Sequence, residues 1–305
     1  MSVKNNSTDQ LYIGIDGGGS KSRARLFSKA TGVLGTGLSG PANAFQDLDG
    51  AIRSIKDATH KALDAADIPR SELGGIITGI GIAGANLPNT RVALQNWKHP
   101  YRDLHVTTDL HIACLGAHHG GNGAVIIAGT GSAGISYVDD TLHVMGGHGF
   151  PFGDKSSGAW MGLQALKHTL LVLDGFAKRT ALVDHMLDKL QLTDAVSIVE
   201  KMSGARSTRF AQFAPCVFQA AQLKDEVAID IIKEGADYLS KMGRRLLEKN
   251  PPRLSFIGGL APFVAPWLDD DVADELSTPY DPPEGGAIIF AERELKPEPL
   301  MVAEL

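Results

Sequence analysis

The same pattern of strand, glycine-rich turn and strand occurs twice in the 305-residue chain. The first copy runs from "LYIGID" (11–16) through three glycines to "RARLFS" (23–28), and the second is "AVIIAGTGSAGISYV" (124–138). Short apolar runs bounded by glycine are typical of buried strands. When residues 15–20 are aligned with residues 127–132, four of six positions are identical. A hairpin repeated in this way predicts an internal duplication with one glycine loop in each half.

Both loops have the composition of a phosphate-binding site. Glycine lets backbone N–H groups approach a ligand closely, and a nest of such groups beside hydroxyls suits phosphate oxygens. The pattern is neither a P-loop nor a dinucleotide fingerprint, because both of those need a helix after the glycines. The residues expected to bind phosphate are Gly17, Gly18, Gly19, Ser20 and Lys21 in the first loop and Gly129, Thr130, Gly131 and Ser132 in the second. Tight β-turns without a ligand are the alternative, and the strand alternation also allows Lys21 to point into solvent.

The two loops differ at one informative position, where Asp16 in the first copy corresponds to Ala128 in the second. A carboxylate beside a phosphate loop is explained if Mg²⁺ lies between them. Because this ion sheds its water reluctantly, we expect Asp16 to hold it through water. A third glycine turn, Gly258-Gly259, ends the apolar run "RLSFI" (253–257), and its bare backbone could lie against a flat ring.

The composition excludes several classes of function. A net charge of −6 offers no basic surface for nucleic acid. No apolar run approaches the roughly 20 residues of a membrane span, and the polar start "MSVKNNSTDQ" lacks the apolar region of a signal peptide. We therefore expect a cytoplasmic protein with no nucleic-acid or membrane partner. Cys114 and Cys216 are the chain's two cysteines, too few for a disulfide framework or a cysteine-built zinc site, and the ten histidines show no convincing ligand spacing.

The motifs in their order along the chain resemble those of the sugar kinase/Hsp70/actin superfamily. Within it the chain is similar to the BadF/BadG/BcrA/BcrD ATPase family, especially its N-acetylglucosamine kinase and glucosamine kinase members. The resemblance is carried by "GIDGGGSKS" (14–22), "GPAN" (40–43), "VTTD" (106–109), "IIAGTGS" (126–132), "GGHGFPFGDKSSGAW" (146–160) and "FIGGLAPF" (256–263). A branch of the family that carries an iron–sulfur cluster needs cysteine ligands, and Cys114 alone near these motifs does not supply them.

This resemblance implies an α/β fold of two similar ribonuclease H-like (actin-like ATPase) domains around an ATP-binding cleft. The first domain is expected at residues 1–112 and the second, with a helical insertion, at 113–284. A C-terminal helix over 285–305 is expected to return to the first domain. ATP and Mg²⁺ are the implied cofactors, with Gly258 and Gly259 at the adenosine and the two hairpins at the phosphates.

Asp109 is the expected catalytic residue. It stands at the end of the strand-like run "DLHVTT" (103–108), and ligands in open α/β sheets gather outside the carboxyl ends of strands. It also matches the family's catalytic aspartate, which implies a general base that takes the proton of an acceptor hydroxyl. On position alone, a helix N-cap is the favoured reading, because aspartate often caps a helix after a strand.

The sugar pocket is expected from two further loops. By resemblance Asn43, Gly147, His148 and Asp154, together with Asp109 and Thr130, contact the acceptor sugar, although an aspartate just before a helix is also an ordinary N-terminal residue. Two positions depart from the family pattern. His148 stands where the family has an aromatic residue, and Lys155 stands where the family motif "GDEGS" has an acid. These changes leave the identity of the sugar open.

The rest of the chain is expected to be mostly helical between about residues 180 and 248. Apolar residues recur there at helical spacing, as expected for core faces: Leu182, Met186, Leu190, Ile229, Ile232, Ala236 and Leu239. Such a subdomain could also serve a homodimer contact. The expected function is ATP-dependent phosphorylation of the 6-hydroxyl of N-acetylglucosamine or glucosamine. A kinase for a different hexose and a non-catalytic ATP-dependent sugar sensor are the alternatives.

Overall fold

The computed structural model describes residues 9–295 of the chain. The chain divides into two compact units, the first made of residues up to Gly121 and from Pro279 onward, and the second of Asn122–Thr278. The expected domain boundaries after residues 112 and 284 fall inside two helices, α3 (Asp109–Ala117) and α12 (Pro283–Leu295). Both helices stay whole in the first unit because they pack against each other there. Residues 296–305, the end of the expected C-terminal helix, lie outside the described residues.

The first unit contains a five-stranded sheet, among its described residues, with the order β3-β2-β1-β4-β5. Its strands are β1 (Leu11–Gly17), β2 (Ser22–Ser28), β3 (Gly32–Ser39), β4 (Ile77–Ile82) and β5 (Asp103–Thr107). β1, β2 and β3 form an antiparallel meander, whereas β4 and β5 run parallel to β1. The prediction that the first glycine loop joins two strands is confirmed. The carboxyl ends of β1, β4 and β5 therefore meet at one edge of this sheet.

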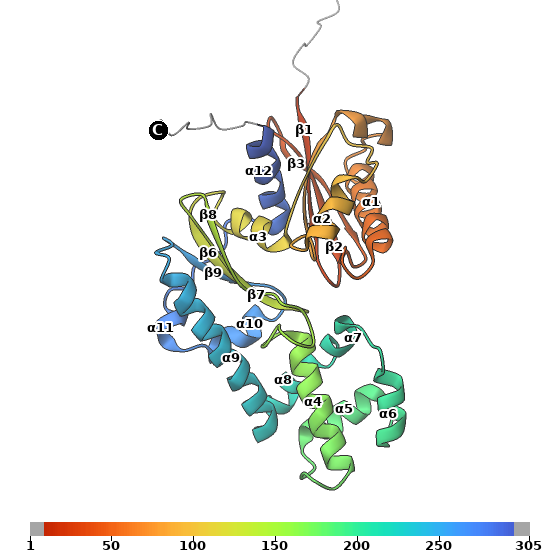
Figure 1. Ribbon diagram of the computed structural model, residues 1–305, viewed down its shortest axis with the longest axis vertical. Coiled ribbons are helices and arrows are strands. Elements are labelled where there is room, and N and C mark those ends of the chain that lie inside the picture. The colour runs from red at the N-terminus through yellow and green to blue at the C-terminus, as the bar shows by residue number, and fades with distance from the viewer. Residues whose placement is uncertain (1–8, 296–305) are drawn as a thin grey trace, which may run out of the picture. The chain divides into compact units, whose positions relative to one another are not determined.

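Helices cover both faces of this sheet. Besides α3 and α12, the unit contains α1 (Leu48–Asp64), the 3₁₀ helix η1 (Arg70–Gly75) and α2 (Pro88–Gln95). Ile13 and Ile15 of β1 are buried in one cluster with Ile55 of α1, while Tyr12 packs with Ile288 of α12 on the other face. This is the period-2 alternation of a strand buried on both sides. Figure 1 shows α12 beside α3 and opposite α1.

α12 approaches the sheet so closely that only glycine fits beneath it. A Cβ atom on Gly14 of β1 would lie 1.8 Å from the carbonyl oxygen of Glu284, and one on Gly79 of β4 would lie 1.9 Å from that of Ala287. Any larger residue at either position would push the helix away. The glycines thereby set the first turns of α12 directly on β1 and β4.

The second unit repeats the strand arrangement of the first. Its described sheet has the order β8-β7-β6-β9, with strands β6 (Gly123–Ala128), β7 (Ser132–Val138), β8 (Thr141–Gly146) and β9 (Leu254–Ile257). β6 pairs antiparallel with β7 and parallel with β9, as β1 does with β2 and β4, and β7–β8 matches β2–β3. The predicted duplication into two similar α/β domains is confirmed.

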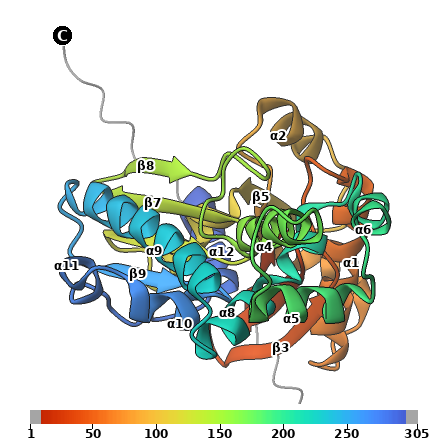
Figure 2. The same ribbon diagram turned by 90° about the horizontal axis from the view of Figure 1, so that it is seen from below.

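The second unit differs from the first in what connects the third and fourth matched strands. Six helices lie between β8 and β9 in the described chain: α4 (Gly158–Leu173), α5 (Ala181–Leu190), α6 (Ala195–Met202), α7 (Ser207–Ala211), α8 (Ala214–Gln222) and α9 (Glu226–Leu247). After β9 come α10 (Ala261–Val264), η2 (Ala265–Trp267) and α11 (Asp270–Ala273). Figure 2 shows α9 lying along the sheet, and α9 contacts β6 and β7.

The apolar residues at helical spacing form the core of this unit. All but one of those expected to be core are buried, namely Leu182, Met186, Leu190, Ile232, Ala236 and Leu239, and Ile229 is partly buried. The six buried residues belong to a cluster that also contains Ile126 of β6, so sheet and helices share one core.

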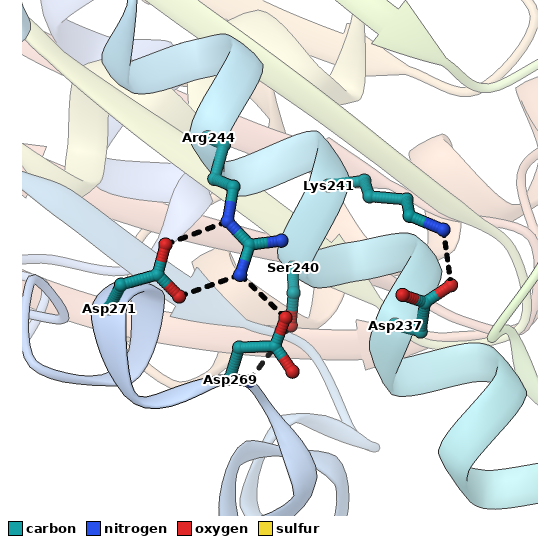
Figure 3. A network of polar contacts seen from close by, with 6 residues as sticks. All are labelled: Asp237, Ser240, Lys241, Arg244, Asp269 and Asp271. Carbon is teal, nitrogen blue, oxygen red and sulfur yellow. Dashed lines mark hydrogen bonds and ion pairs between the residues drawn. The ribbon is translucent and has the colours of Figure 1, made fainter.

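A polar network at the surface attaches the end of α9 to the segment that contains α11 (Figure 3). Arg244 Nε donates to Asp271 Oδ2 at 2.7 Å, and Arg244 Nη2 donates to Asp269 Oδ2 at 2.6 Å. The backbone N–H of Asp269 donates to Ser240 Oγ at 3.0 Å. The hydrogen bonds that Arg244 donates to Asp271, and next to Asp269, raise the pKa of Arg244.

Candidate active site

The first glycine loop is tied to the "GPAN" segment through the backbone. Gly18 N–H donates to the Lys21 carbonyl at 3.0 Å and closes the turn, and the Gly18 carbonyl accepts from Ala42 N–H at 2.9 Å. Ser20 and Lys21, at the tip, are exposed. The solvent position that the strand alternation allowed for Lys21 is therefore the one it takes in this structure.

Asp16 lies at the end of β1 in a strongly acidic environment. Burial, followed by the charges of Asp109 and Glu284, raises the pKa of Asp16 to about 7, and Arg23 and Lys21 oppose the shift. Two carboxyl groups, those of Asp109 and Glu284, therefore act on a third, that of Asp16, at the carboxyl edge of the first sheet. A site with this much unbalanced negative charge favours a cation.

Asp109 is not the N-cap of α3, so the alternative based on position alone is wrong. Thr108 is the cap, because its side chain accepts a hydrogen bond from His111 N–H at 3.1 Å. Asp109 is the first residue of the helix, and its Oδ1 accepts from Leu110 N–H at 2.9 Å. The negative side chain therefore sits where the positive end of the helix dipole stabilises it.

Asn43 is held by backbone and side-chain hydrogen bonds that leave its amino group available. Its backbone forms a β-bridge with Ala83, directly after β4. Its Oδ1 accepts from the N–H groups of Phe45 and Gln46, both at 3.1 Å, which leaves the Nδ2 amino group as the side chain's means of contacting a ligand. Asp16 and Asp109 thus lie at the ends of β1 and β5, and Asn43 lies beside the end of β4 between these two strands.

The second glycine loop is held by the start of α4. Gly158 N–H donates to the Gly129 carbonyl at 2.8 Å, and Ala159 N–H donates to the Thr130 carbonyl at 3.3 Å. These contacts satisfy N–H groups of the first turn of α4, which Ser157 caps by accepting from Trp160 N–H. The loop carbonyls therefore point toward α4.

Asp154 lies against this loop. A Cβ atom on Gly131 would come within 2.8 Å of Asp154 Oδ2, so Gly131 makes room for the carboxylate. Oδ1 accepts from Gly149 N–H at 3.2 Å, and burial raises the pKa of Asp154. Asp154 is therefore a buried carboxylate beside the loop.

The two residues that depart from the family pattern lie on either side of Asp154. His148 is exposed, and Gly147 before it donates its N–H to the Ser132 carbonyl at 3.1 Å. Lys155 Nζ forms an ion pair with Glu234 Oε1 of α9 at 2.8 Å and lies 5.9 Å from the centre of the Trp160 ring. Glu234 of α9 thus places an acid beside residue 155, the position at which the family motif itself has an acid.

The third glycine turn follows β9, at the same edge as the second loop. Leu260 N–H donates to the Ala128 carbonyl at 3.0 Å, and a Cβ atom on Gly258 would lie 2.3 Å from that oxygen. Gly258 also has φ of 106°, which side chains rarely adopt. Because β6 and β9 are parallel neighbours, their following glycines lie together at one edge.

Gly19, Gly129 and Gly259 have no steric reason within the described chain to be glycine. A Cβ atom on any of them would meet no atom within 4 Å, and their φ angles lie outside the left-handed region. Each belongs to one of the three predicted nucleotide loops. Open space of this kind leaves room for a ligand to approach the backbone closely.

The residues of the first unit fit a hydrated Mg²⁺. Within residues 9–295, no group of three or more His, Cys, Asp or Glu side chains could hold a metal ion directly. Mg²⁺ keeps several waters and is usually bound through one or two carboxylates together with substrate phosphates. The excess negative charge around Asp16 is what such an ion would neutralise.

Glu284 is the site residue that sequence reasoning missed. No site residue is expected from the sequence in the segment "EGGAIIF" (284–290), and only a C-terminal helix is expected from residue 285 onward. The structure places Glu284 in the first turn of α12, close enough to affect Asp16. The signal in the sequence is an acidic residue directly before two glycines, because paired glycines are typical of backbone that another group approaches closely.

The two sheets have matching strand order, and in each a glycine-rich loop joins the first strand to the second. This arrangement defines an actin-like ATPase fold. The chain belongs to the BadF/BadG/BcrA/BcrD ATPase family, whose model matches residues 13–273. No helix in residues 9–295 has both the length and the apolar character needed to cross a membrane.

Relatives of known description cover nearly the whole chain. A glucosamine kinase of Vibrio cholerae is 34% identical over 280 residues, which are 92% of this chain and 95% of the relative. An N-acetyl-D-glucosamine kinase of Dictyostelium discoideum is 26% identical over 92% of this chain and 97% of the relative. The crystal structure of a Chromobacterium violaceum protein assigned as an N-acetylglucosamine kinase superposes with a TM-score of 0.88 at 26% identity, covering 93% of this chain and all of that one.

Proposed function

We propose that the protein is an ATP-dependent amino-sugar kinase that transfers the γ-phosphoryl group of ATP to the 6-hydroxyl of glucosamine or N-acetylglucosamine. The observation that carries this proposal is the placement of Asp16 and Asp109 at the ends of β1 and β5, on one sheet edge, where the charge of Asp109 helps to raise the pKa of Asp16. Hydroxyl phosphorylation by ATP needs a cation on the phosphates and one carboxylate to receive the hydroxyl proton. Because ATP is the donor, we place the activity in the cytoplasm.

In this proposal Asp109 is the general base. As the sugar oxygen attacks the γ-phosphorus, its proton passes to the Asp109 carboxylate, and the bond from the γ-phosphorus to the bridging oxygen breaks to release ADP. Asp16 would hold hydrated Mg²⁺, which neutralises phosphate charge when bound. The Thr108 cap and the Leu110 N–H hold Asp109 at the start of α3, which supports an unchanging orientation.

We assign the phosphates of ATP to backbone N–H groups of Gly17–Lys21 in the first unit and of Gly129–Ser132 in the second. Thr130 adds a hydroxyl beside the transferring group. Gly258 and Gly259 are assigned to the adenosine. The open space at Gly19, Gly129 and Gly259 supports this assignment, since a ligand can approach the backbone there.

The acceptor sugar is assigned to Asn43, Gly147, His148, Asp154 and Asp109. Asn43 offers donors from Nδ2, and Asp154 offers carboxylate oxygens from a buried position. A buried polar group that is matched by a sugar hydroxyl discriminates strongly against acceptors that lack it.

A panel of sugars tests the function. Purified protein with Mg-ATP is offered glucosamine, N-acetylglucosamine, N-acetylmuramic acid, glucose and mannose, and ADP release is measured with a coupled assay. We expect turnover with an amino sugar and little with the neutral hexoses. Preference for a plain hexose would overturn the amino-sugar assignment. Binding of ATP and sugar without ADP release would identify a sensor instead.

A further inference from the structure

Glu284 is a buried acid, and one of its carboxylate oxygens accepts no hydrogen bond from the described residues. It is 6% exposed, and its Oε2 atom has no hydrogen-bond partner among the residues that the structure describes. An unsatisfied buried carboxylate oxygen is costly, because it has given up water without replacement. The first turn of α12 offsets part of this cost through the helix dipole.

The fold fixes this acid above the end of β1. The carbonyl of Glu284 rests over Gly14, two residues before Asp16, at a separation that admits no side chain. The Glu284 charge acts on Asp16, whose pKa it helps to raise. Two carboxyl groups are therefore held near each other although they repel.

The cation that is paired with Glu284 makes its hydrogen bonds to another residue. Arg25 Nη1 donates to both carboxylate oxygens of Asp281, at 2.7 and 2.9 Å. Its Nη2 lies 3.6 Å from Glu284 Oε1, which is an ion pair but beyond a good hydrogen bond. Asp281 thus holds Arg25, and Glu284 Oε2 receives no hydrogen bond from it, so this oxygen can accept one from another partner.

We propose that Glu284 is a further positioning residue for the divalent cation, and that its Oε2 accepts a hydrogen bond from a water molecule of the cation's hydration shell, beside Asp16. This inference rests on the proposed function, since it concerns the cation that accompanies ATP. Glu284 acts through the ion and its water and touches no reacting atom. Asp281 supports it by holding Arg25 aside.

The test compares nucleotide binding with and without metal. The dissociation constant of ATP is measured by calorimetry for wild type and Glu284→Gln, once in Mg²⁺ and once in EDTA. We expect the variant to bind Mg-ATP about tenfold more weakly, the scale of one charge-assisted hydrogen bond. It should bind metal-free ATP as well as or better than wild type, because a negative charge near the phosphates has been removed. A merely structural role would weaken both.

Two further variants sharpen the result. Glu292→Gln, on the same helix but paired with Lys29 at 2.8 Å, serves as the matched control and should change neither affinity. Asp281→Asn should release Arg25 toward Glu284 and weaken Mg-ATP binding in the same direction as Glu284→Gln. Equal affinities for Mg-ATP in wild type and Glu284→Gln would overturn the inference.

The outcomes separate this inference from the proposed function. A protein that phosphorylates an amino sugar but shows no metal-specific effect of Glu284→Gln overturns the cation role alone. A protein that phosphorylates no sugar yet shows opposite shifts in Mg²⁺ and EDTA overturns the kinase proposal and supports the cation role.

Discussion

The side chain of Thr108 caps α3 by accepting the N–H of His111 at 3.1 Å, and this frees the neighbouring Asp109 from capping. The two residues can therefore be tested separately. Asp109→Asn keeps an oxygen for Leu110 N–H but cannot take a proton. We expect kcat to fall by a factor on the order of 100 to 10,000 with Tm little changed. Thermal melts and coupled assays measure both.

Thr108→Ala is the matched change. It removes the cap and should lower the free energy of unfolding by about 1 kcal/mol, with a much smaller effect on kcat. Near-normal turnover in Asp109→Asn would contradict the base assignment.

Asp16 should make stability depend on pH. Its pKa is raised to about 7 from 3.8. Between these values the folded protein keeps a proton that the unfolded chain has lost, so the free energy of unfolding falls as pH rises toward 7. Asp16→Asn removes this penalty, and in EDTA it should raise Tm more at pH 8 than at pH 5. It should also abolish the benefit of Mg²⁺ to ATP binding.

Asp57 provides the opposite case. Hydrogen bonds from Lys61 and then Ser39 lower the pKa of Asp57, so its ionised form is favoured by folding. Asp57→Asn should not raise Tm at either pH. The same gain in Tm from Asp16→Asn at both pH values would show that the raised pKa is not the cause.

Gly129→Ala tests whether open space at the loop is kept for a ligand. The fold should accept the new methyl group and gain about 0.4–1 kcal/mol from a stiffer unfolded chain. Loss of one well-placed phosphate contact should lower kcat/KM by at least about a hundredfold. Gly74→Ala is the control, because that glycine of η1 is equally open and lies away from the loops. It should leave kinetics unchanged. Unaltered ATP affinity in Gly129→Ala would remove Gly129 from the site.

Lys155 should influence the choice between a charged and a neutral amino sugar. Glucosamine carries a positive charge when its amine is protonated, whereas N-acetylglucosamine is neutral. Lys155→Ala leaves Glu234 unpaired and makes the region more negative, so kcat/KM for glucosamine relative to N-acetylglucosamine should rise about threefold at low salt. Glu234→Gln should shift the ratio the other way. A ratio that is equal in both variants would show that the pair does not act on the sugar.

Most of the fold could be predicted from local sequence patterns. The strands flanking each glycine loop were predictable because the run "LYIGID" and the loop after it contain their own signals. The domain boundary near residue 112 was not, because α3 is retained in the first unit by α12, which arrives from the far end of the chain. Contacts between segments so far apart leave no mark in a local window of sequence.

The candidate site likewise contains residues that could be predicted from the sequence and one that was missed. Asp16 and Asp109 stand at strand ends that the sequence displays, so they could be named. Glu284 was missed, since its importance comes from its effect on the pKa of Asp16 and from an oxygen that has no hydrogen-bond partner among the described residues. The cap of α3 was misplaced by one residue, because threonine and aspartate both cap well and only the hydrogen bond distinguishes them.

The seating of α12 on Gly14 and Gly79 also affects how the protein is made. β1 and β4 are synthesised long before α12, which covers one face of both strands. Tyr12 and Ile77 therefore stay uncovered on that face until Ile288 has been made. The second unit is continuous from Asn122 to Thr278 and can complete its core while this face of the first is still bare. A chain shortened to end before residue 283 would therefore have a second unit with a complete core and a first unit that is still sensitive to protease.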